Sequence, residues 1–453
     1  MNTKMKWLLF TKLKKIKYMQ KKYTTLLIVS LGLLQLKVSA QETVYPVGPQ
    51  AGPIVITHAT VHVGNGTVLT DASVSFDKGK ITGVGASVST AGATIIDATG
   101  KQVYPGLIVP LSSLGLREIN SGVRGSNDFQ EIGENNASIR TIVSFNTDSK
   151  VINVLRANGV LLAHVAPMGE LIEGSSSIVQ LDAWNYEDAA YKTDIGMFIN
   201  MPTLIPRRSG RGGFVRQAGG DMVKEAMKKI ETIKTFFTEA RAYLQEKNHA
   251  ENNLKFEAVR GLFAGKQKLY IRANEVKQML LAIDLGKTFG FNMVIVGAVE
   301  SLQIASILVE NNIPVILDNQ HALPTTEDDD IDQLYKLPAQ LKKAGVLFAI
   351  NDANDQSKQR NISFNAGTAA AYGLSKEEAL SAITLNTAKI LGIDDITGSI
   401  EMGKDANIII SDGDILDMRG NQVTKAFIQG RDISLDNKQK QMYERYKHKY
   451  KIN

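Results

Sequence analysis

Residues 268–319 read "KLYIRANEVKQMLLAIDLGKTFGFNMVIVGAVESLQIASILVENNIPVILDN" and alternate two kinds of pattern. Mostly apolar runs, as expected for parallel strands covered on both faces, are separated by segments with apolar residues at helical spacing. The strand-like runs, with two more outside this stretch, are 268–274, 292–300, 313–319, 159–165 and 345–352. The helix-like segments are 275–290, 299–312 and a longer one at about 221–247. Strand–helix alternation of this length predicts a (β/α)8 barrel.

Both ends of the chain have a different character, with short β-rich runs separated by turn signals such as "GNG" and "DKGK". We therefore expect one small β domain that is split in the sequence. The fold class is α/β: a distorted TIM (β/α)8 barrel plus a small β-sandwich built from both chain ends. The predicted parts are the first β segment at 41–104, the barrel at 105–396, the second β segment at 397–433 and a basic C-terminal tail at 434–453.

The first forty residues have the order of a cleavable secretory signal. They contain nine lysines and no acid, then the apolar run "TTLLIVSLGLL" (24–34), then the small residues "VSA" (38–40). A membrane anchor is the alternative, but the run is short for crossing a bilayer. We expect cleavage after Ala40 and a periplasmic or secreted protein, with either Met1 or Met19 as the start.

Removal of residues 1–40 changes the charge of the chain. The whole sequence has a net charge of +6, whereas 43 basic and 46 acidic residues remain after residue 40, a net charge of −3. No nucleic-acid partner is therefore predicted. The sequence has no cysteine, which excludes disulfides, thiolate catalysis and cysteine metal sites and fits export to an oxidising compartment.

Two stretches resemble the metal-dependent amidohydrolase superfamily, in particular its exported imidazolonepropionase-like members. They are "RNISFNAGTAAAYGLSKEEALSAITLNTAKILGIDDITGSIEMGKDANIIISDGDIL" (360–416) and "GKQVYPGLI" (100–108). The resemblance extends over nearly all of 52–433. It implies a barrel in which a divalent ion activates a water molecule for attack on a carbonyl carbon.

The resemblance also implies where metal ligands should lie, and most are missing. The family's His-x-His after the first strand falls on Leu111 and Ser113. Its histidine after strand five falls on Arg272, and the one after strand six falls near Gly297. Only the aspartate after strand eight is retained, as Asp352. Because an ion needs three or more ligands, we expect no cofactor, or a divalent metal such as zinc if this correspondence is wrong.

Four side chains are the candidates for any remaining chemistry. Arg272 needs an anion if it is buried, and we expect a bidentate pair with Asp352. A contact with Glu300, or with solvent, is the alternative. His164 and His321 both follow strand-like runs and could face the barrel mouth, although hydrogen-bonded structural histidines are the favoured interpretation.

The segment "PMGELIEGSSSIVQLD" (167–182) is rich in glycine and serine and is predicted to be a loop at the mouth. Glu173 and Ser175–Ser177 are possible contacts for a ligand there, although an ordinary ordered loop is an equal alternative. Glu170 and Glu300 are the candidate ligand-binding carboxylates.

Two classes of function follow. In the favoured class, the chain is a non-catalytic amidohydrolase homologue that binds a small-molecule or peptide-like ligand, or supports a catalytic paralogue; a homo-oligomer is also expected. In the second class, it hydrolyses carbon–nitrogen bonds of a peptide-like or cyclic amide. Asp352 would then be the general base, acting with His164 or His321, and Arg272 would stabilise the oxyanion.

Overall fold

The computed structural model describes residues 44–118, 128–204, 219–246, 248–318, 320–323, 330–352 and 356–452. The predicted signal segment at 1–40 and its cleavage site therefore lie outside the described residues. The described chain from Tyr45 onward forms one compact unit with two sheets.

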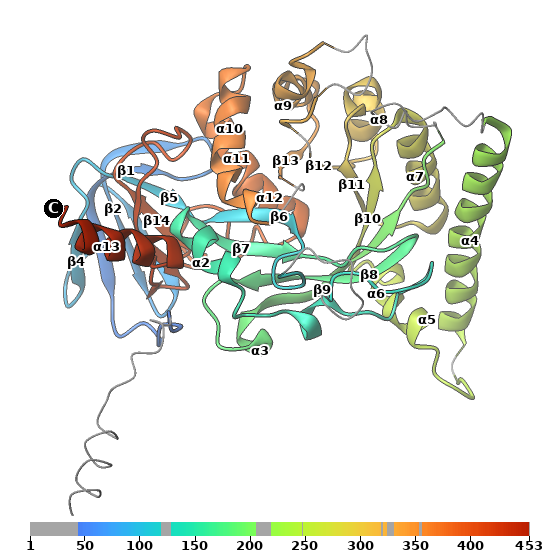
Figure 1. Cartoon of the computed structure of the whole chain (residues 1–453), viewed down its shortest axis with the longest axis horizontal. Helices are drawn as coiled ribbons and strands as arrows, with labels where there is room; N and C mark the ends of the chain where they lie inside the picture. Colours follow the sequence, from blue (N-terminus) through green and yellow to red (C-terminus); the bar gives the residue numbers. More distant parts are fainter. Residues whose placement is uncertain are drawn as a thin grey trace, which may run out of the picture. The chain divides into compact units, whose positions relative to one another are not determined.

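Eight strands form the barrel sheet, and they follow one another in sequence order (Figure 1). They are β6 (Leu107–Ser112), β7 (Val160–Val165), β8 (Ile172–Gln180), β9 (Ala190–Asn200), β10 (Lys268–Ala273), β11 (Met293–Gly297), β12 (Val315–Leu317) and β13 (Phe348–Ile350). All neighbours are parallel except that β8 runs antiparallel to both β7 and β9. The predicted α/β barrel is confirmed, and the five predicted strands correspond to β7, β10, β11, β12 and β13.

Strand β8 corrects one expectation, because it lies within the segment that the sequence predicts to be a mouth loop. All nine residues of β8 are buried. Its serines are accommodated because each finds a polar partner: the Ser175 hydroxyl donates to Asp194 (2.9 Å) and Ser176 contacts the His164 ring (2.7 Å). A sequence rich in glycine and serine is typical of a loop. Here the serines can be buried because residues of other strands satisfy their hydroxyl groups.

The barrel is nearly closed rather than fully hydrogen-bonded. Among the described residues β6 and β13, at the two ends of the sheet, do not pair with each other. The Gln359 side chain in η3 (Lys358–Asn361), which follows β13 in the chain, bonds to β6: it accepts from the Ser112 hydroxyl (2.6 Å) and donates to the Leu111 carbonyl (2.7 Å). The Ile108 amide also donates to the Ile383 carbonyl (3.0 Å). These contacts join β6, the first strand of the barrel, to segments that follow β13, the last one.

Helices surround the barrel. They are η1 (Thr141–Ser144), α2 (Lys150–Ala157), α3 (Tyr186–Ala189), α4 (Gly219–Gln245), α5 (Leu254–Ala258), α6 (Arg260–Phe263), α7 (Val276–Phe289), η2 (Ser301–Ile304), α8 (Ala305–Glu310), α9 (Gln333–Ala344), α10 (Ile362–Ala371), α11 (Lys376–Ala382) and α12 (Leu385–Leu391). The segment 275–290 forms α7 as predicted, and 299–312 contains η2 and α8. Buried Ile230, Ile233 and Phe237 of the long helix α4 pack in the core, and α4 corresponds to the helix expected at about 221–247.

The second sheet joins both ends of the chain, as predicted. Its strands are β1 (Ile54–His62), β2 (Val68–Asp77), β3 (Lys80–Gly85), β4 (Thr94–Asp97), β5 (Gln102–Pro105), β14 (Ile408–Ser411), β15 (Val423–Ile428) and β16 (Arg431–Asp432). Strand β5 pairs with both β1 and β14, so the two ends share one hydrogen-bonded sheet. Phe76 and Phe427, from the two ends, meet in its core at 5.0 Å between ring centroids.

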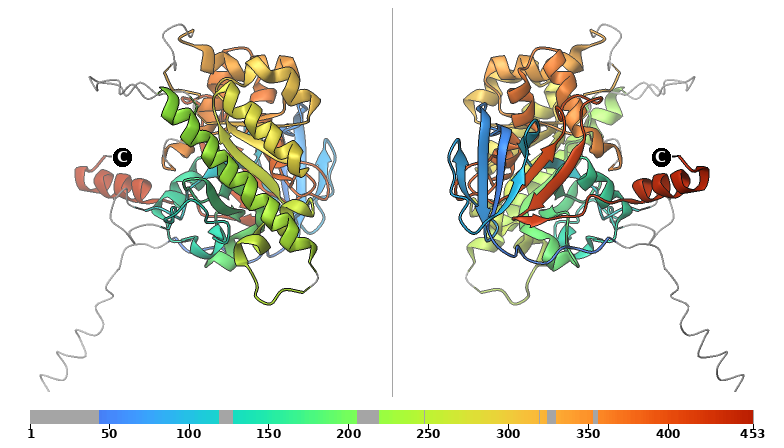
Figure 2. Two further views of the ribbon diagram at one scale, coloured as in Figure 1. Left: turned by 90° about the vertical axis from the view of Figure 1, so that its right-hand side faces the viewer. Right: turned by 90° about the vertical axis from the view of Figure 1, so that its left-hand side faces the viewer.

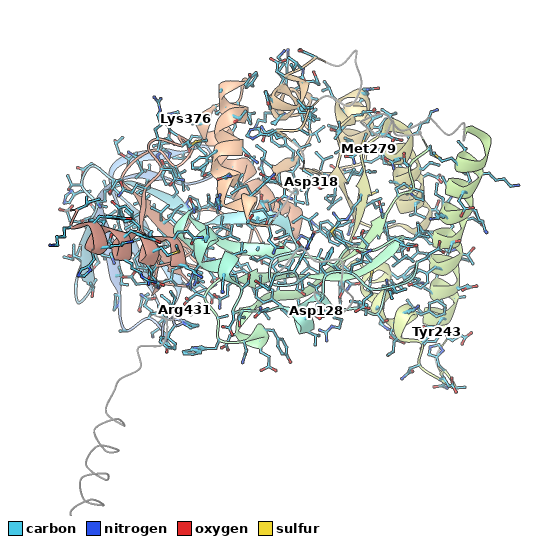
Figure 3. All side chains as sticks on the ribbon, in the orientation of Figure 1. Asp128, Tyr243, Met279, Asp318, Lys376 and Arg431 are labelled. Atoms are coloured by element: carbon cyan, nitrogen blue, oxygen red, sulfur yellow. The ribbon has the colours of Figure 1, made fainter. Side chains whose placement is uncertain are left out.

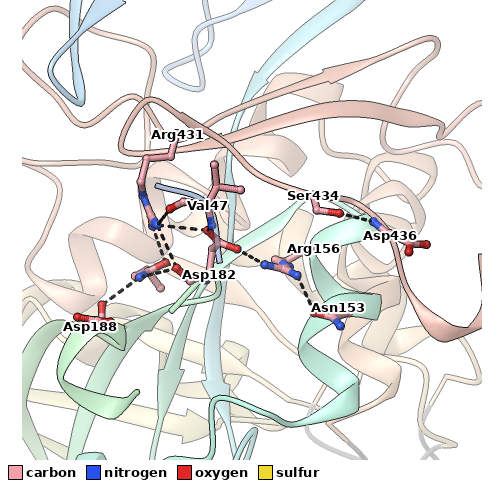
Figure 4. Close-up of polar contacts among 9 residues, drawn as sticks. Val47, Asn153, Arg156, Asp182, Asp188, Arg431, Ser434 and Asp436 are labelled. Atoms are coloured by element: carbon pink, nitrogen blue, oxygen red, sulfur yellow. Dashed lines mark hydrogen bonds and ion pairs between the residues drawn. The ribbon is translucent and has the colours of Figure 1, made fainter. Parts of the chain in front are cut away.

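A buried ion cluster links this sheet to the barrel (Figure 4). Asp182, which follows β8, accepts hydrogen bonds from Arg156 of α2 on one carboxylate oxygen. Its other oxygen accepts from the Val47 amide (3.0 Å) and from Arg431 of β16 (3.2 Å). The Asp182 side chain is completely buried and that of Arg156 is 3% exposed. One carboxylate therefore connects three distant parts of the chain.

The predicted basic C-terminal tail contains a helix, α13 (Lys438–Tyr450). It extends outward from the rest of the described chain (Figure 2). Within the described residues, no helix combines the length and the apolar character needed to cross a lipid bilayer.

Candidate functional site

A polar layer lies inside the barrel, above an apolar one. The apolar layer contains one or more side chains from every strand, including Leu162, Tyr270, Ile316 and Ala349. Side chains two residues apart on a strand point to the same face. The residues two positions farther along the same strands are His164, Arg272, Asp318 and Asn351. They therefore form the next layer toward the carboxyl ends of the strands, where barrel enzymes place their chemistry.

Arg272 pairs with Glu173 of β8 rather than with Asp352. Its Nε donates to both carboxylate oxygens, at 3.1 Å each, and its guanidinium lies 5.2 Å from the centre of the Phe198 ring. The Glu173 side chain is 1% exposed and that of Arg272 is 20% exposed. Burial raises the pKa of Glu173 in spite of the neighbouring guanidinium. The expected Arg272–Asp352 pair is thus corrected, because the antiparallel strand β8 brings a nearer carboxylate into the barrel.

Two further acids, the buried Asp318 and the partly buried Asp352, belong to this region. Asn351 donates to one Asp318 oxygen at 2.9 Å, and burial raises the pKa of Asp318, with the Asp352 charge adding to the effect. Figure 3 labels Asp318. One oxygen of Asp352 accepts from Asn365 at 3.4 Å. Its other oxygen, and the side-chain oxygen of Asn351, are enclosed without a hydrogen-bond partner among the described residues. The polar layer therefore contains two oxygen atoms that could each accept a hydrogen bond from a ligand.

His164 lies wholly inside the protein and does not face the mouth. Its Nδ1 is 2.8 Å from the Pro110 carbonyl and its Nε2 is 2.7 Å from the Ser176 hydroxyl. Burial lowers the pKa of His164 to about 4, so the ring is neutral at pH 7. Because a carbonyl only accepts, Nδ1 carries the proton and Nε2 accepts from Ser176. Both ring nitrogens are occupied, as in a structural histidine.

The other predicted site residues lie apart. His321 is exposed after β12, where its Nε2 is 3.0 Å from the Thr368 hydroxyl of α10, and no described contact joins it to His164. Glu300 accepts from the Val276 amide at 2.8 Å and so stabilises the first turn of α7. Glu170 is exposed in the turn between β7 and β8. The structure does not assemble these residues into one constellation.

Comparison with known proteins accounts for this architecture. A sequence model described as "Amidohydrolase family" matches residues 294–433. The solved structure of an amidohydrolase from Thermotoga maritima has 26% identity and a TM-score of 0.74, and the alignment covers 84% of this chain and 99% of that one. The chain belongs to the amidohydrolase superfamily.

Two further similarities are narrower. Imidazolonepropionase from Picrophilus torridus is 45% identical over 74 residues, which span 16% of this chain and only 18% of that relative. The structure of a molinate hydrolase shares the fold at 16% identity and a TM-score of 0.53, with 85% of this chain and 95% of that chain covered.

Members of the amidohydrolase family usually use metal ions, but the residues at the corresponding positions of this chain do not fit one. Leu111 belongs to the apolar barrel core, and the Ser113 hydroxyl donates to Gln356 at 2.9 Å. Gly297 has a φ of +94°, and a Cβ there would lie 2.3 Å from the Asn274 side-chain oxygen. Arg272 contributes a cation where an ion would require a donor. In the described parts of the chain, no three His, Asp or Glu side chains are placed to hold a metal.

Sequence reasoning missed Asp318 and Asn351 as members of this layer. A signal was present, since each lies two residues beyond the middle of a predicted buried strand and therefore shares the interior face of Ile316 or Ala349. Glu173 was considered only as a loop residue. Its role depends on β8, whose strand character is not apparent from its composition.

Asp318→Asn should stabilise the protein at pH 7, because burial disfavours the ionised carboxylate. The raised pKa of Asp318 means that the folded state holds a proton more tightly than the unfolded state. Stability is therefore lost as pH rises through that interval, and asparagine, which still accepts from Asn351, avoids the loss. Urea unfolding at pH 4.5 and pH 7 should show the gain growing with pH.

The matched control is Asp284→Asn on α7, where the carboxylate is 59% exposed and pairs with Lys234 at 3.1 Å. That change should be nearly neutral at both pH values. A destabilised Asp318→Asn protein at pH 7 would show instead that the ionised carboxylate contributes favourably.

Proposed function

We propose that this member of the amidohydrolase superfamily is an exported protein that binds a ligand at its barrel mouth and does not carry out metal-dependent hydrolysis. The observation that carries the proposal is the Arg272–Glu173 pair. A fixed guanidinium at the position of a metal-binding histidine repels a divalent cation, and Leu111 and Gly297 supply no compensating donor.

The unused hydrogen-bonding groups of the polar layer support ligand binding. Buried polar atoms in proteins nearly always have partners. One oxygen each of Asn351 and Asp352, and both amide atoms of Gln320, are buried without partners among the described residues. A small-molecule or peptide-like ligand with N–H donors would satisfy the three oxygens, and a carbonyl oxygen on the same ligand would accept from the Gln320 amide nitrogen. A catalytic amidohydrolase paralogue and a second copy of the chain are the macromolecular partners that belong to this proposal.

The alternative is hydrolysis of carbon–nitrogen bonds by an unorthodox site, which superfamily membership and the retained Asp352 favour. One oxygen of Asp352 is buried without a hydrogen-bond partner among the described residues and would be the general base. The residues that would act with Asp352 already have partners. Both ring nitrogens of His164 are hydrogen-bonded, and Arg272 forms an ion pair with Glu173. We therefore place ligand binding first.

Metal content separates the two proposals. The protein is expressed with its own leader, purified without a chelating tag, and analysed for zinc, manganese, iron and nickel by mass spectrometry. We expect far less than one ion per chain, unchanged by incubation with zinc, and no hydrolysis of dipeptides, N-acyl amino acids or cyclic amides. The same preparation, analysed as an intact mass, should lack residues 1–40.

One ion per chain, together with hydrolysis that a chelator abolishes, would overturn the proposal. Metal-independent hydrolysis that disappears in Asp352→Asn would establish the alternative. The matched variant is Asp432→Asn, which changes an exposed acid in strand β16 of the second sheet.

A further inference from the structure

The α13 helix carries an aromatic stripe along one side. Tyr443, Tyr446 and Tyr450 recur at intervals of three and four residues, so their side chains share one helix face, and Met442 borders them. Their exposed fractions run from 44% to 63%. Tyr446 and Tyr450 stack at 6.2 Å between ring centroids. This is an ordered apolar surface presented to solvent.

Basic side chains lie along both edges of the stripe. At 100° per residue, Arg445 and Lys449 fall on one edge and Lys440 and Lys447 on the other. Lys449 lies 5.1 Å from the Tyr450 ring centre, and Lys447 lies 5.6 Å from that of Tyr443. The long stems of these lysines thus follow the rings while their charges point outward.

The charge of α13 is opposite to that of the body. Residues 438–451 contain six basic residues and one acid, a net charge of +5, whereas 41–437 contain 37 basic and 45 acidic residues, a net charge of −8. An anionic surface would therefore attract the helix and repel the remainder of the chain. The distribution orients the protein with α13 toward such a surface.

Nothing in the described chain covers the stripe. No residue of α13 is buried, and the helix packs along no other described helix or strand. Its first turn is capped by the Asn437 side chain, which accepts from the Lys440 amide at 3.0 Å. Figure 2 shows the helix projecting from the protein.

We propose that α13 docks the protein on the surface of an anionic phospholipid membrane, with the tyrosine stripe in the headgroup region and the flanking lysines on the lipid phosphates. Tyrosine suits this boundary because its ring is apolar and its hydroxyl is polar. A cationic helix with an aromatic face lies in the plane of the interface and does not span it. This surface is separate from the barrel mouth and does not depend on what the mouth binds.

Vesicle flotation of the purified protein tests the proposal. We expect recovery with vesicles of phosphatidylglycerol and phosphatidylethanolamine, and little recovery with phosphatidylcholine alone. Lys447→Gln/Lys449→Gln should weaken binding about 30-fold at low salt, since each basic residue near an anionic surface contributes more than a fivefold change. Tyr443→Ser/Tyr446→Ser/Tyr450→Ser should weaken it at least about tenfold.

Lys224→Gln/Lys228→Gln, which removes two exposed charges from α4, is the matched control and should bind as the unmodified protein does. All variants should keep the same unfolding temperature, because α13 buries nothing. Equal binding to neutral vesicles, or no binding to anionic ones, overturns the proposal. So does binding that the tyrosine changes leave intact, or tighter binding to duplex DNA than to anionic vesicles.

Discussion

Replacing Arg272 with methionine is expected to lower the free energy of unfolding by about 3 kcal/mol at pH 7. The substitution leaves Glu173 enclosed in the barrel with its side chain 1% exposed and no cation beside it. An ionised carboxylate in that environment has lost most of its hydration. Methionine retains the apolar contact with Phe198, so the loss reports chiefly on the charge.

The effect should depend on pH. Burial already raises the pKa of Glu173, and removal of Arg272 raises it further. A carboxyl whose folded pKa exceeds its unfolded value favours the folded state at low pH and loses that contribution as pH rises. The destabilisation should therefore be smaller at pH 5 than at pH 7, as measured by urea unfolding.

A second substitution identifies the cause. Glu173→Gln/Arg272→Met removes both charges and should recover much of the lost stability. Glu173→Gln alone should cost less than Arg272→Met, because Arg272 is 20% exposed and water can hydrate it. If the double variant is no more stable than Arg272→Met, the pair is not the source of the effect.

Asparagine at position 182 should be at least as damaging, with an expected loss of about 3–4 kcal/mol. The Asp182 carboxylate is completely buried between Arg156 and Arg431, and the change leaves two guanidinium groups without their counter-charge. The Val47 amide and Arg431 both donate to the same carboxylate oxygen of Asp182. If the amide NH2 of asparagine takes the place of that oxygen, donors face a donor and both hydrogen bonds are lost. Replacement is therefore not isosteric in hydrogen bonding.

Chemical unfolding and limited proteolysis would measure this effect, since Asp182 also holds the segment around Val47. Glu257→Gln is the control, because the Glu257–Arg260 pair is similarly close (2.8 Å) but joins α5 to α6 with side chains that are 32% and 54% exposed. Its loss should change stability only slightly. Equal losses in the two variants would mean that burial does not determine the contribution of the Asp182 cluster.

The sequence alone determined the elements whose signals are local. Alternation of apolar strands with helical spacing in 268–319 predicted β10, α7, β11 and β12 in their observed order, because each period depends only on neighbouring residues. The short β runs predicted a sheet that joins both chain ends. The resemblance alone assigned Leu111 and Gly297 to positions of metal ligands. The structure gives the reason that neither position holds a metal-binding side chain: Leu111 is in the apolar core, and Gly297 has no room for a side chain.

The tertiary structure alone decided the partners. Glu173 and Arg272 are 99 residues apart, and only the antiparallel insertion of β8 between β7 and β9 brings them together. The same strand gives His164 its Ser176 partner and thereby encloses it. Hydrogen-bond partners and burial depend on contacts between distant strands, and no local period in the sequence encodes them. The pairing of side chains in the site therefore depends on how the strands come together in the barrel. The strands and helices of the barrel themselves follow from local sequence patterns.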